Sequence, residues 1–361
     1  MNTETQEVVK DIYEEGEETI ENVVPPADIF AFNESRSCAD LKRMYDKKQI
    51  DISPDFQREL VWNSPSKARF LDSLLKNLPI PSMCISLDIS SQKRVVIDGL
   101  QRISTIVEFL DAVENDRELV LSSLDDIDDR LSGKSIKQIK EYSPDVIGFI
   151  ENVSIPVTVL RCDLSKENHM EYIFTIFHRL NTGGTKLNSQ EIRNCIFNGK
   201  FNDMLFNCSY EKNRELESLL GTKNSRFTFE EFILRFFAFQ DELNNYNGKL
   251  TSFLNEYMRK NRMLSEDEIT NKKDLFIKTV DVLYSKITEE EKFSRVILEA
   301  LLYGVGKNLE RSSLMSNEYF NSLCQEILDS TAFQSSELQG GLMHQSKVKA
   351  RLNIADEIFR R

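Results

Sequence analysis

The sequence lacks the features that mark several common classes of protein. It has no run of about 18 apolar residues, so no membrane span is predicted. Its first 21 residues are acidic and polar, which is unlike a secretory signal peptide. The three histidines, His169, His178 and His344, lie far apart and show no paired metal-ligand spacing. A nuclease with several histidine ligands is therefore not expected.

Cysteine pairs and an excess of basic charge are also missing. The six cysteines are scattered without a Cys-x-x-Cys pair, which argues against a zinc knuckle and predicts reduced, mostly buried thiols in a cytoplasmic protein. Lys and Arg total 46 against 59 Asp and Glu, which gives a net charge of −13. Because such a chain repels nucleic acid at long range, any DNA contact requires a local basic patch.

The composition is that of a globular protein large enough for two domains. The 361 residues are 40% hydrophobic and 29% charged. Residues 1–30 are rich in Glu and end near Pro25-Pro26, which indicates an acidic tail and linker, or alternatively a mask over a basic cleft. Residues 31–200 mix strand and helix patterns, and residues 201–361 carry successive amphipathic helices. We expect an α+β protein with a mixed α/β domain followed by an all-helical domain.

Local patterns predict individual elements. Helices are expected over residues 38–48, 67–77 and 168–180, with Ser37 as a cap for the first, and strands over 83–87, 94–97 and 154–160. Six phenylalanines between 227 and 239 are expected to form core, with a base-stacking platform as the alternative. The last helix, residues 346–361, carries five basic side chains, which indicates a solvated face or a contact with a partner or nucleic acid.

Residues 94–105 carry the most informative local pattern. A β-branched run at 95–97 predicts a buried strand, Gly99 allows a sharp turn, and apolar residues then recur at helical spacing. A strand, a glycine turn and a helix N-terminus form an anion site, because unpaired N–H groups and the helix dipole point at the turn. Arg102 suits a phosphate, and Asp98 could orient a metal or a hydroxyl. The alternative is an ordinary turn with a surface arginine.

Two further clusters hold candidate binding residues. Residues 55–62 read Asp-Phe-Gln-Arg-Glu-Leu-Val-Trp and end on the single tryptophan of the chain, for which a place in the core is the alternative. Residues 177–194 contain a Gly183-Gly184 loop flanked by basic side chains, followed by the start of a helix. Such a loop can wrap an anion with backbone N–H groups, or it can simply end one helix and begin the next.

In this order, the three clusters resemble the N-terminal domain family of GmrSD-type restriction endonucleases. Members of that family read roughly PxFQRxxVW, PIPxxxL, xIDGQQRxxTL and FxRLNTGGxxLxxxExRN. This chain has the corresponding residues at 54–62, 79–81, 97–105 and 177–194. The combination is more specific than any one motif, and the resemblance covers about residues 36–200.

The resemblance implies a ParB/sulfiredoxin-like fold that binds and hydrolyses a nucleoside triphosphate with Mg²⁺, in systems that attack modified foreign DNA. By position it implies catalytic roles for Asp98, Gln101, Arg102 and Glu191, with Asp98 also a metal ligand. It implies nucleotide contacts for Gln57, Arg58, Gly99, Ser104, Thr105, Arg179, Asn181, Arg193 and Asn194.

Two departures from the family pattern shape the expected function. Leu100 stands where the family most often has glutamine, and this loss of hydrogen-bonding groups bears on nucleotide selectivity and turnover. The family's nucleases carry an HNH-type histidine motif, whereas no histidine-rich segment follows residue 200 here. We therefore expect a nucleotide-dependent sensor or regulator that works with a separate nuclease or effector chain. The alternatives are a metal-dependent nuclease using Asp98 with Glu191, and a binding module without turnover.

Overall fold

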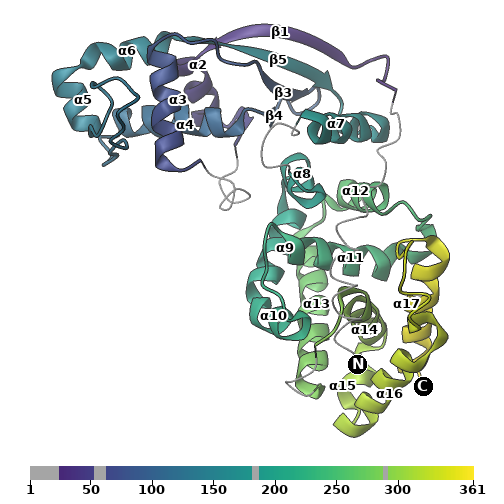
Figure 1. Cartoon of the computed structure of the whole chain (residues 1–361). Coiled ribbons are helices and arrows are strands. Elements are labelled where there is room, and N and C mark those ends of the chain that lie inside the picture. The colour runs from purple at the N-terminus through teal and green to yellow at the C-terminus, as the bar shows by residue number, and fades with distance from the viewer. Residues whose placement is uncertain (1–23, 53–61, 181–186, 288–291) are drawn as a thin grey trace. The chain divides into compact units, whose positions relative to one another are not determined.

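The computed structural model describes residues 24–52, 62–180, 187–287 and 292–361. They form two compact units that divide between Asn188 and Ser189 (Figure 1). We call the part before this division the sheet unit and the part after it the helical unit. The division precedes the boundary expected near residue 200, because helix α8 (Ser189–Ile196) packs against α11 (Thr228–Glu242) and α12 (Leu250–Asn261).

The sheet unit is built on a five-stranded mixed sheet with the order β1-β5-β3-β4-β2. The bounds of the strands are β1 (Phe30–Ser37), β2 (Ile50–Asp51), β3 (Met83–Asp88), β4 (Arg94–Asp98) and β5 (Ser154–Cys162). The β1–β5 and β3–β4 pairs are antiparallel, and the β3–β5 and β2–β4 pairs are parallel. The strands expected from the sequence correspond to β3, β4 and β5.

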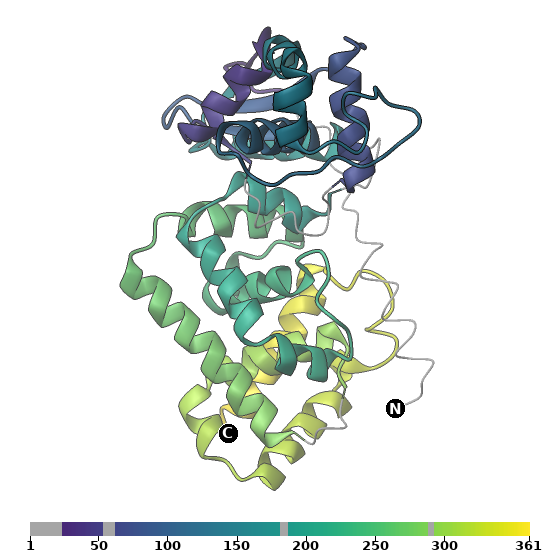
Figure 2. The same cartoon turned by 90° about the vertical axis from the view of Figure 1, so that its left-hand side faces the viewer.

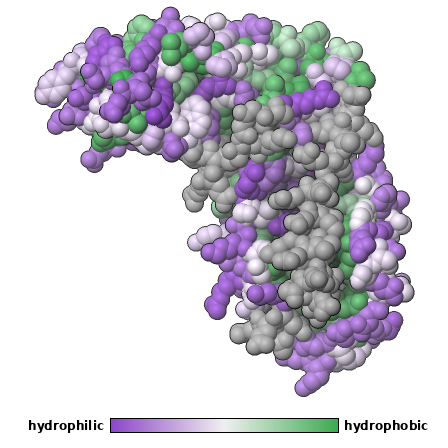
Figure 3. Space-filling model, in the orientation of Figure 1, coloured by the Kyte–Doolittle hydropathy of each residue, from purple (hydrophilic) through white to green (hydrophobic). Residues whose placement is uncertain are grey.

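Strand β1 lies at an edge of this sheet, and the sequence pattern does not predict it. Most of its side chains are exposed, so it lacks the alternation of buried and exposed residues that marks a half-buried strand. Phe30 and Phe32 are among the exposed ones, and Figure 3 shows apolar surface where this strand begins.

Helices pack on the sheet and on one another in this unit. Their bounds are α2 (Cys38–Asp46), α3 (Ser64–Leu75), α4 (Leu100–Glu114), α5 (Ile136–Tyr142), α6 (Pro144–Asn152) and α7 (Glu167–Leu180). The apolar faces of α2, α3 and α4 form one core with sheet residues such as Ile85 and Val96, while α7 packs beside β4. Ser37 Oγ accepts a hydrogen bond from Asp40 N at 3.1 Å, which confirms the predicted cap.

The helical unit confirms the expectation of an all-helical second half. Besides α8, α11 and α12 it contains α9 (Lys200–Glu211), α10 (Asn213–Leu220), α13 (Glu266–Lys286), α14 (Arg295–Lys307), α15 (Leu309–Leu314), α16 (Asn317–Asp329) and α17 (Gln345–Phe359). The long helix α13 crosses this unit in Figure 2. Five of the six phenylalanines are buried, at positions 229, 232, 236, 237 and 239, so their core role is confirmed.

Two further expectations are tested by burial. Arg351 in α17 is buried and donates to the Leu342 carbonyl at 2.7 Å, which corrects the expectation of a solvated basic face at this position. The reason is that α17 packs against α14 and α16. All six cysteines are reduced thiols, and all except Cys195 are buried, as predicted. Within the described ranges, no helix is long and apolar enough to cross a membrane.

Candidate functional site

The turn between β4 and α4 depends on Gly99. Its φ of +94° lies in the left-handed region, which side chains other than that of glycine rarely adopt. A Cβ at this position would lie 2.6 Å from Met83 Cγ and 3.0 Å from Arg102 Nη2. Both the backbone conformation and the close packing therefore require glycine here. Because glycine has no side chain, the backbone at this turn can approach a ligand closely.

Strand β4 ends irregularly just before this turn. Cys84 of β3 pairs with Asp98, the next residue, Ile85, pairs with Val96, and the register shifts between the two. Irregularities of this kind redirect a strand end and re-aim its side chains. Burial, with a smaller contribution from the nearby Asp98 charge, raises the pKa of the Cys84 thiol to about 12. The Cys84 thiol is therefore protonated at neutral pH, as expected of a packing residue.

The cap position at the N-terminus of α4 provides no side-chain hydrogen bond of its own. Gly99 occupies the cap position and has no side chain to bond the N–H groups of the first turn. Its carbonyl accepts the first helical bond, from Ile103 N at 3.0 Å. In a helix of 15 residues the aligned peptide dipoles leave partial positive charge at this end. The turn has the chemistry of an anion site, as the sequence pattern predicts.

Arg102 is fixed at this turn by two contacts. Its Nη2 donates to Asp98 Oδ2 at 2.9 Å, and its Nη1 donates to the carbonyl of Pro81. The Arg102 side chain is 13% exposed and that of Asp98 is 38% exposed. A guanidinium carries five N–H donors, so these two contacts use two of them. The arginine is held in place while retaining donors suited to a phosphate.

The other predicted residues on α4 have different surroundings. Gln101 Oε1 accepts a hydrogen bond from Trp62 N at 2.9 Å, so this side chain ties the segment before α3 to the helix start. Thr105 is buried, and its hydroxyl donates to the Gln101 carbonyl at 2.7 Å inside the helix. Ser104 is half-buried. Leu100 is half-buried and packs against the core, which explains why an apolar residue is accepted there.

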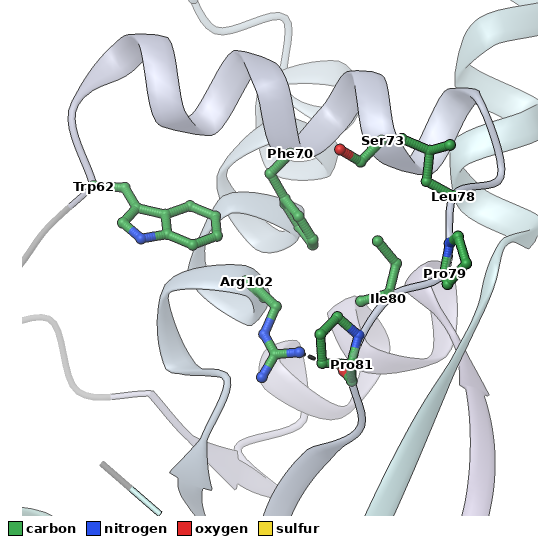
Figure 4. A pocket seen from close by; sticks show the side chains of 8 residues that line it. All are labelled: Trp62, Phe70, Ser73, Leu78, Pro79, Ile80, Pro81 and Arg102. Carbon is green, nitrogen blue, oxygen red and sulfur yellow. Dashed lines mark hydrogen bonds between the residues drawn. The ribbon is translucent and has the colours of Figure 1, made fainter. Parts of the chain in front are cut away.

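An apolar pocket adjoins the turn through Arg102 (Figure 4). We call it the aromatic pocket. Its volume is about 430 Å³, and it is lined by Trp62, Phe70, Ser73, Leu78, Pro79, Ile80, Pro81 and Arg102. Trp62 and Phe70 meet edge to face, with ring centroids 5.5 Å apart and an interplanar angle of 66°. Trp62 is thus partly core and partly pocket wall, a dual role that the sequence does not predict.

Gln57, Arg58 and Asn181 are outside the described residues. Arg179 is exposed near the end of α7. Their assignment to nucleotide contacts stays a prediction.

Glu191, Arg193 and Asn194 belong to helix α8 of the helical unit, not to the sheet unit that carries Gly99. Glu191 is 2% exposed and bonds Arg226 through both carboxylate oxygens, at 3.0 and 2.6 Å. Arg193 is 1% exposed and donates to the Asn255 amide at 2.9 Å and to Glu231 at 3.1 Å. Their described contacts are internal to the helical unit, and they indicate structural roles.

The residues at the turn fit a metal only with help from a ligand. No group of three or more His, Cys, Asp or Glu side chains that could hold a metal ion occurs in the described part of the chain. Asp98 offers one accessible carboxylate. Mg²⁺ commonly uses one or two carboxylates together with substrate phosphates and waters, so this carboxylate is consistent with a site completed by phosphate oxygens.

These features define a mixed α/β domain in which a glycine turn, with chemistry suited to an anion, joins a strand to a helix. Residues 41–198 match the family described as GmrSD restriction endonuclease, N-terminal domain. These residues are similar to that family, as the sequence motifs predict, and the family's name refers to restriction endonucleases. No curated protein and no solved structure gives a significant match to the chain.

Proposed function

We propose that the sheet unit binds a nucleoside triphosphate at the Gly99 turn, and that the protein is a nucleotide-dependent sensor or regulator of a restriction system. The observation that carries this proposal is the placement of Arg102 beside the N-terminus of α4, where Gly99 occupies the cap position. Helix N–H groups, a left-handed glycine and a guanidinium are together suited to a chain of phosphates. The family match supports the restriction context.

In this proposal each residue at the turn has a separate task. Arg102 exchanges its bond to Asp98 for bonds to phosphate oxygens, while its bond to the Pro81 carbonyl keeps it in place. Asp98, once released, holds Mg²⁺ or a water molecule. Mg²⁺, when bound with the nucleotide, supplies further neutralisation of phosphate charge. Gln101 keeps the Trp62 segment against the helix start. Gln57, Arg58, Arg179 and Asn181 remain proposed contacts, as do Ser104 and Thr105.

Binding and hydrolysis are distinct parts of the proposal. Phosphoryl transfer to water needs charge stabilisation and an oriented water, and Asp98 is the acidic side chain at the turn. Glu191, the other acidic candidate, is buried against Arg226. The ion pair between Glu191 and Arg226, together with the apolar Leu100, leaves few groups for catalysis. Both therefore favour a second candidate function, a nucleotide-binding module without turnover. They give no support to a nuclease built on Asp98 with Glu191.

We further propose that the nucleotide state controls contact with a modified DNA or with a separate nuclease or effector chain in the cytoplasm. A net charge of −13 disfavours non-specific DNA binding. Recognition of DNA by this protein would therefore be specific and local.

The experiment is phosphate release and equilibrium binding with a panel of nucleoside triphosphates and Mg²⁺, with and without DNA. Arg102→Ala should reduce nucleotide affinity by roughly tenfold or more, because charge-assisted bonds to phosphate are lost. Arg130→Ala is the matched control. This arginine belongs to the same unit but is not part of the turn, and its Nη2 donates to Asp128 Oδ2 at 2.8 Å. Turnover that disappears in Arg102→Ala supports an NTPase. Binding without turnover supports the second candidate, and the absence of nucleotide binding rejects both.

A further inference from the structure

The aromatic pocket and the Gly99 turn share a wall. Arg102 lines the pocket, and the same side chain bonds Asp98 at the turn. Figure 4 shows Trp62, Phe70 and Ile80 pointing toward a common space beside this arginine. A molecule whose charged end lies at the turn can therefore extend a second, uncharged end into the pocket.

The pocket walls and the turn are tied together by two hydrogen bonds from the first turn of α4. Gln101 accepts from the backbone N–H of Trp62, at the aromatic end of the pocket. Arg102 donates to the carbonyl of Pro81, on the proline-rich wall. The relative position of pocket and turn is thus fixed by direct contacts within one unit.

The walls suit a flat ring better than a polar group. Pro79 and Pro81 carry no backbone N–H, so they offer no donors. The hydroxyl of Ser73 already donates to the Arg69 carbonyl at 2.8 Å, which leaves it as an acceptor toward the pocket. Trp62, Phe70 and Ile80 contribute apolar and aromatic surface. Apart from Arg102 and the indole N–H of Trp62, these walls bind by stacking and shape, and they provide little hydrogen-bond readout.

Resting on the proposed function, we infer that the aromatic pocket takes the base of the nucleotide whose phosphates lie at the Gly99 turn. The base is held by stacking, so purine nucleotides bind more tightly than pyrimidine nucleotides, while adenine and guanine are poorly distinguished. A volume of about 430 Å³ lies within the usual range for small-ligand sites. Stacking of a base on an aromatic side chain corresponds to an affinity change of roughly 5- to 100-fold.

Trp62 provides a direct probe, because it is the single tryptophan of the chain and lies in the pocket wall. The full chain is titrated with ATP, GTP, CTP, adenosine and inorganic tripolyphosphate while tryptophan fluorescence is followed. ATP and GTP should quench the fluorescence at similar concentrations and CTP at a higher one. Tripolyphosphate should compete with ATP and bind with little quenching of its own, since it has no ring to stack.

The possible outcomes separate this inference from the proposed function. If ATP and tripolyphosphate bind equally well and neither quenches Trp62, the phosphate site stands and the base pocket is rejected. If adenosine quenches but no phosphate compound competes, a ring-binding pocket exists and the proposed phosphate site is rejected. If neither phosphate compound binds and only single-stranded DNA quenches Trp62, the pocket belongs to a nucleic-acid base and the inference is overturned.

Variants at Trp62 give a second, independent test by calorimetry. Trp62→Ala should lower ATP affinity by about tenfold and leave tripolyphosphate affinity unchanged. Trp62→Phe, which keeps an aromatic ring, should retain most of the ATP affinity of the native protein. Tyr142→Ala is the matched control, because this exposed aromatic of the same unit lies outside the pocket. Circular dichroism checks that each variant is folded. Equal losses for ATP and tripolyphosphate in a folded Trp62→Ala protein would overturn the inference.

Discussion

Arg102 Nη2 lies 2.9 Å from Asp98 Oδ2, and these two residues flank Gly99. Arg102 also donates to the Pro81 carbonyl, so a second contact fixes its guanidinium at the turn. The Asp98 side chain is the more exposed of the pair. The carboxylate therefore supports the arginine and at the same time competes with any anion for it.

The first prediction concerns this competition. Asp98→Asn keeps the size of the side chain and removes its charge. Without Mg²⁺, ATP should bind the variant about two- to fivefold more tightly, because a partly exposed ion pair no longer has to be broken. Any turnover with Mg²⁺ should fall by roughly 100-fold or more, since the proposed metal or water ligand is lost.

Calorimetry in EDTA and a phosphate-release assay measure the two effects separately. Asp128→Asn removes the same charge from a comparable pair with Arg130, and it should change neither quantity. Weaker ATP binding by Asp98→Asn in EDTA would show that the carboxylate has no competing role.

The second prediction concerns the backbone at Gly99. Gly99→Ala should lower the free energy of unfolding by roughly 2–4 kcal/mol, because the left-handed backbone and the contact with Met83 Cγ both oppose a Cβ. Urea unfolding measures this loss.

Two other glycines separate the effect of the left-handed backbone from the effect of the Met83 contact. Gly340 has a φ of +58° and open space around it, so Gly340→Ala should cost about 1–2 kcal/mol. Gly148 has open space within a helix, so Gly148→Ala should not destabilise the protein. Equal losses at Gly99 and Gly340 would rule out the Met83 contact as a constraint.

The turn itself could be predicted from the sequence because its signals are local. A β-branched strand, one glycine and a helical period follow one another within residues 94–110, and β4 and α4 form as expected. The fixed position of Arg102 could not be predicted in the same way. It depends on a hydrogen bond to the Pro81 carbonyl, and the packing of the loop that follows α3 places this carbonyl beside the arginine.

The aromatic pocket shows why some sites escape sequence reasoning. Its walls come from Trp62, which precedes α3, and from α3, the loop at 78–81 and α4, which meet through tertiary packing. The proline-rich motif at 79–81 indicates an apolar wall, since proline has no backbone N–H donor. It does not indicate which aromatic side chains lie across the pocket from it.

Glu191 shows a second limit of local sequence patterns. The helix expected after the Gly183-Gly184 loop is present as α8, but the pattern does not tell which unit this helix packs on. That is decided by the fit of its buried face to α11 and α12.

The third prediction tests the structural role of Glu191. Glu191→Gln should lower the free energy of unfolding by about 1–3 kcal/mol, because a buried carboxylate with two bonds to Arg226 is replaced by a neutral amide. Nucleotide affinity and turnover should be unchanged in the folded variant. Glu266→Gln is the control, since its pair with Lys200 is exposed and should contribute little. Loss of turnover without loss of stability would restore Glu191 to a catalytic role.

The fourth prediction is a dependence of stability on pH that arises from Glu231. Burial alone would raise the pKa of this carboxyl, but the charges of Arg235 and Arg193 outweigh it and lower the pKa to about 2. Glu231 bonds Arg235 at 2.8 Å and Arg193 at 3.1 Å. Because the pKa is lower in the folded state, the ion pairs contribute stability above the ordinary pKa of 4.5, and this contribution is lost as the pH falls from there toward 2.

Urea unfolding of the native protein and of Glu231→Gln at several pH values measures this contribution. At pH 7 the variant should be less stable by roughly 1–3 kcal/mol, an amount reduced by the partial exposure of the side chain. The difference should shrink steadily between pH 4.5 and pH 2, because protonation removes the charge from the native carboxylate as the substitution does. Glu266→Gln should show no such convergence, since its exposed pair contributes little at any pH. A difference between the native protein and Glu231→Gln that stays constant down to pH 2 would mean that the glutamate acts through its packing and not through its charge.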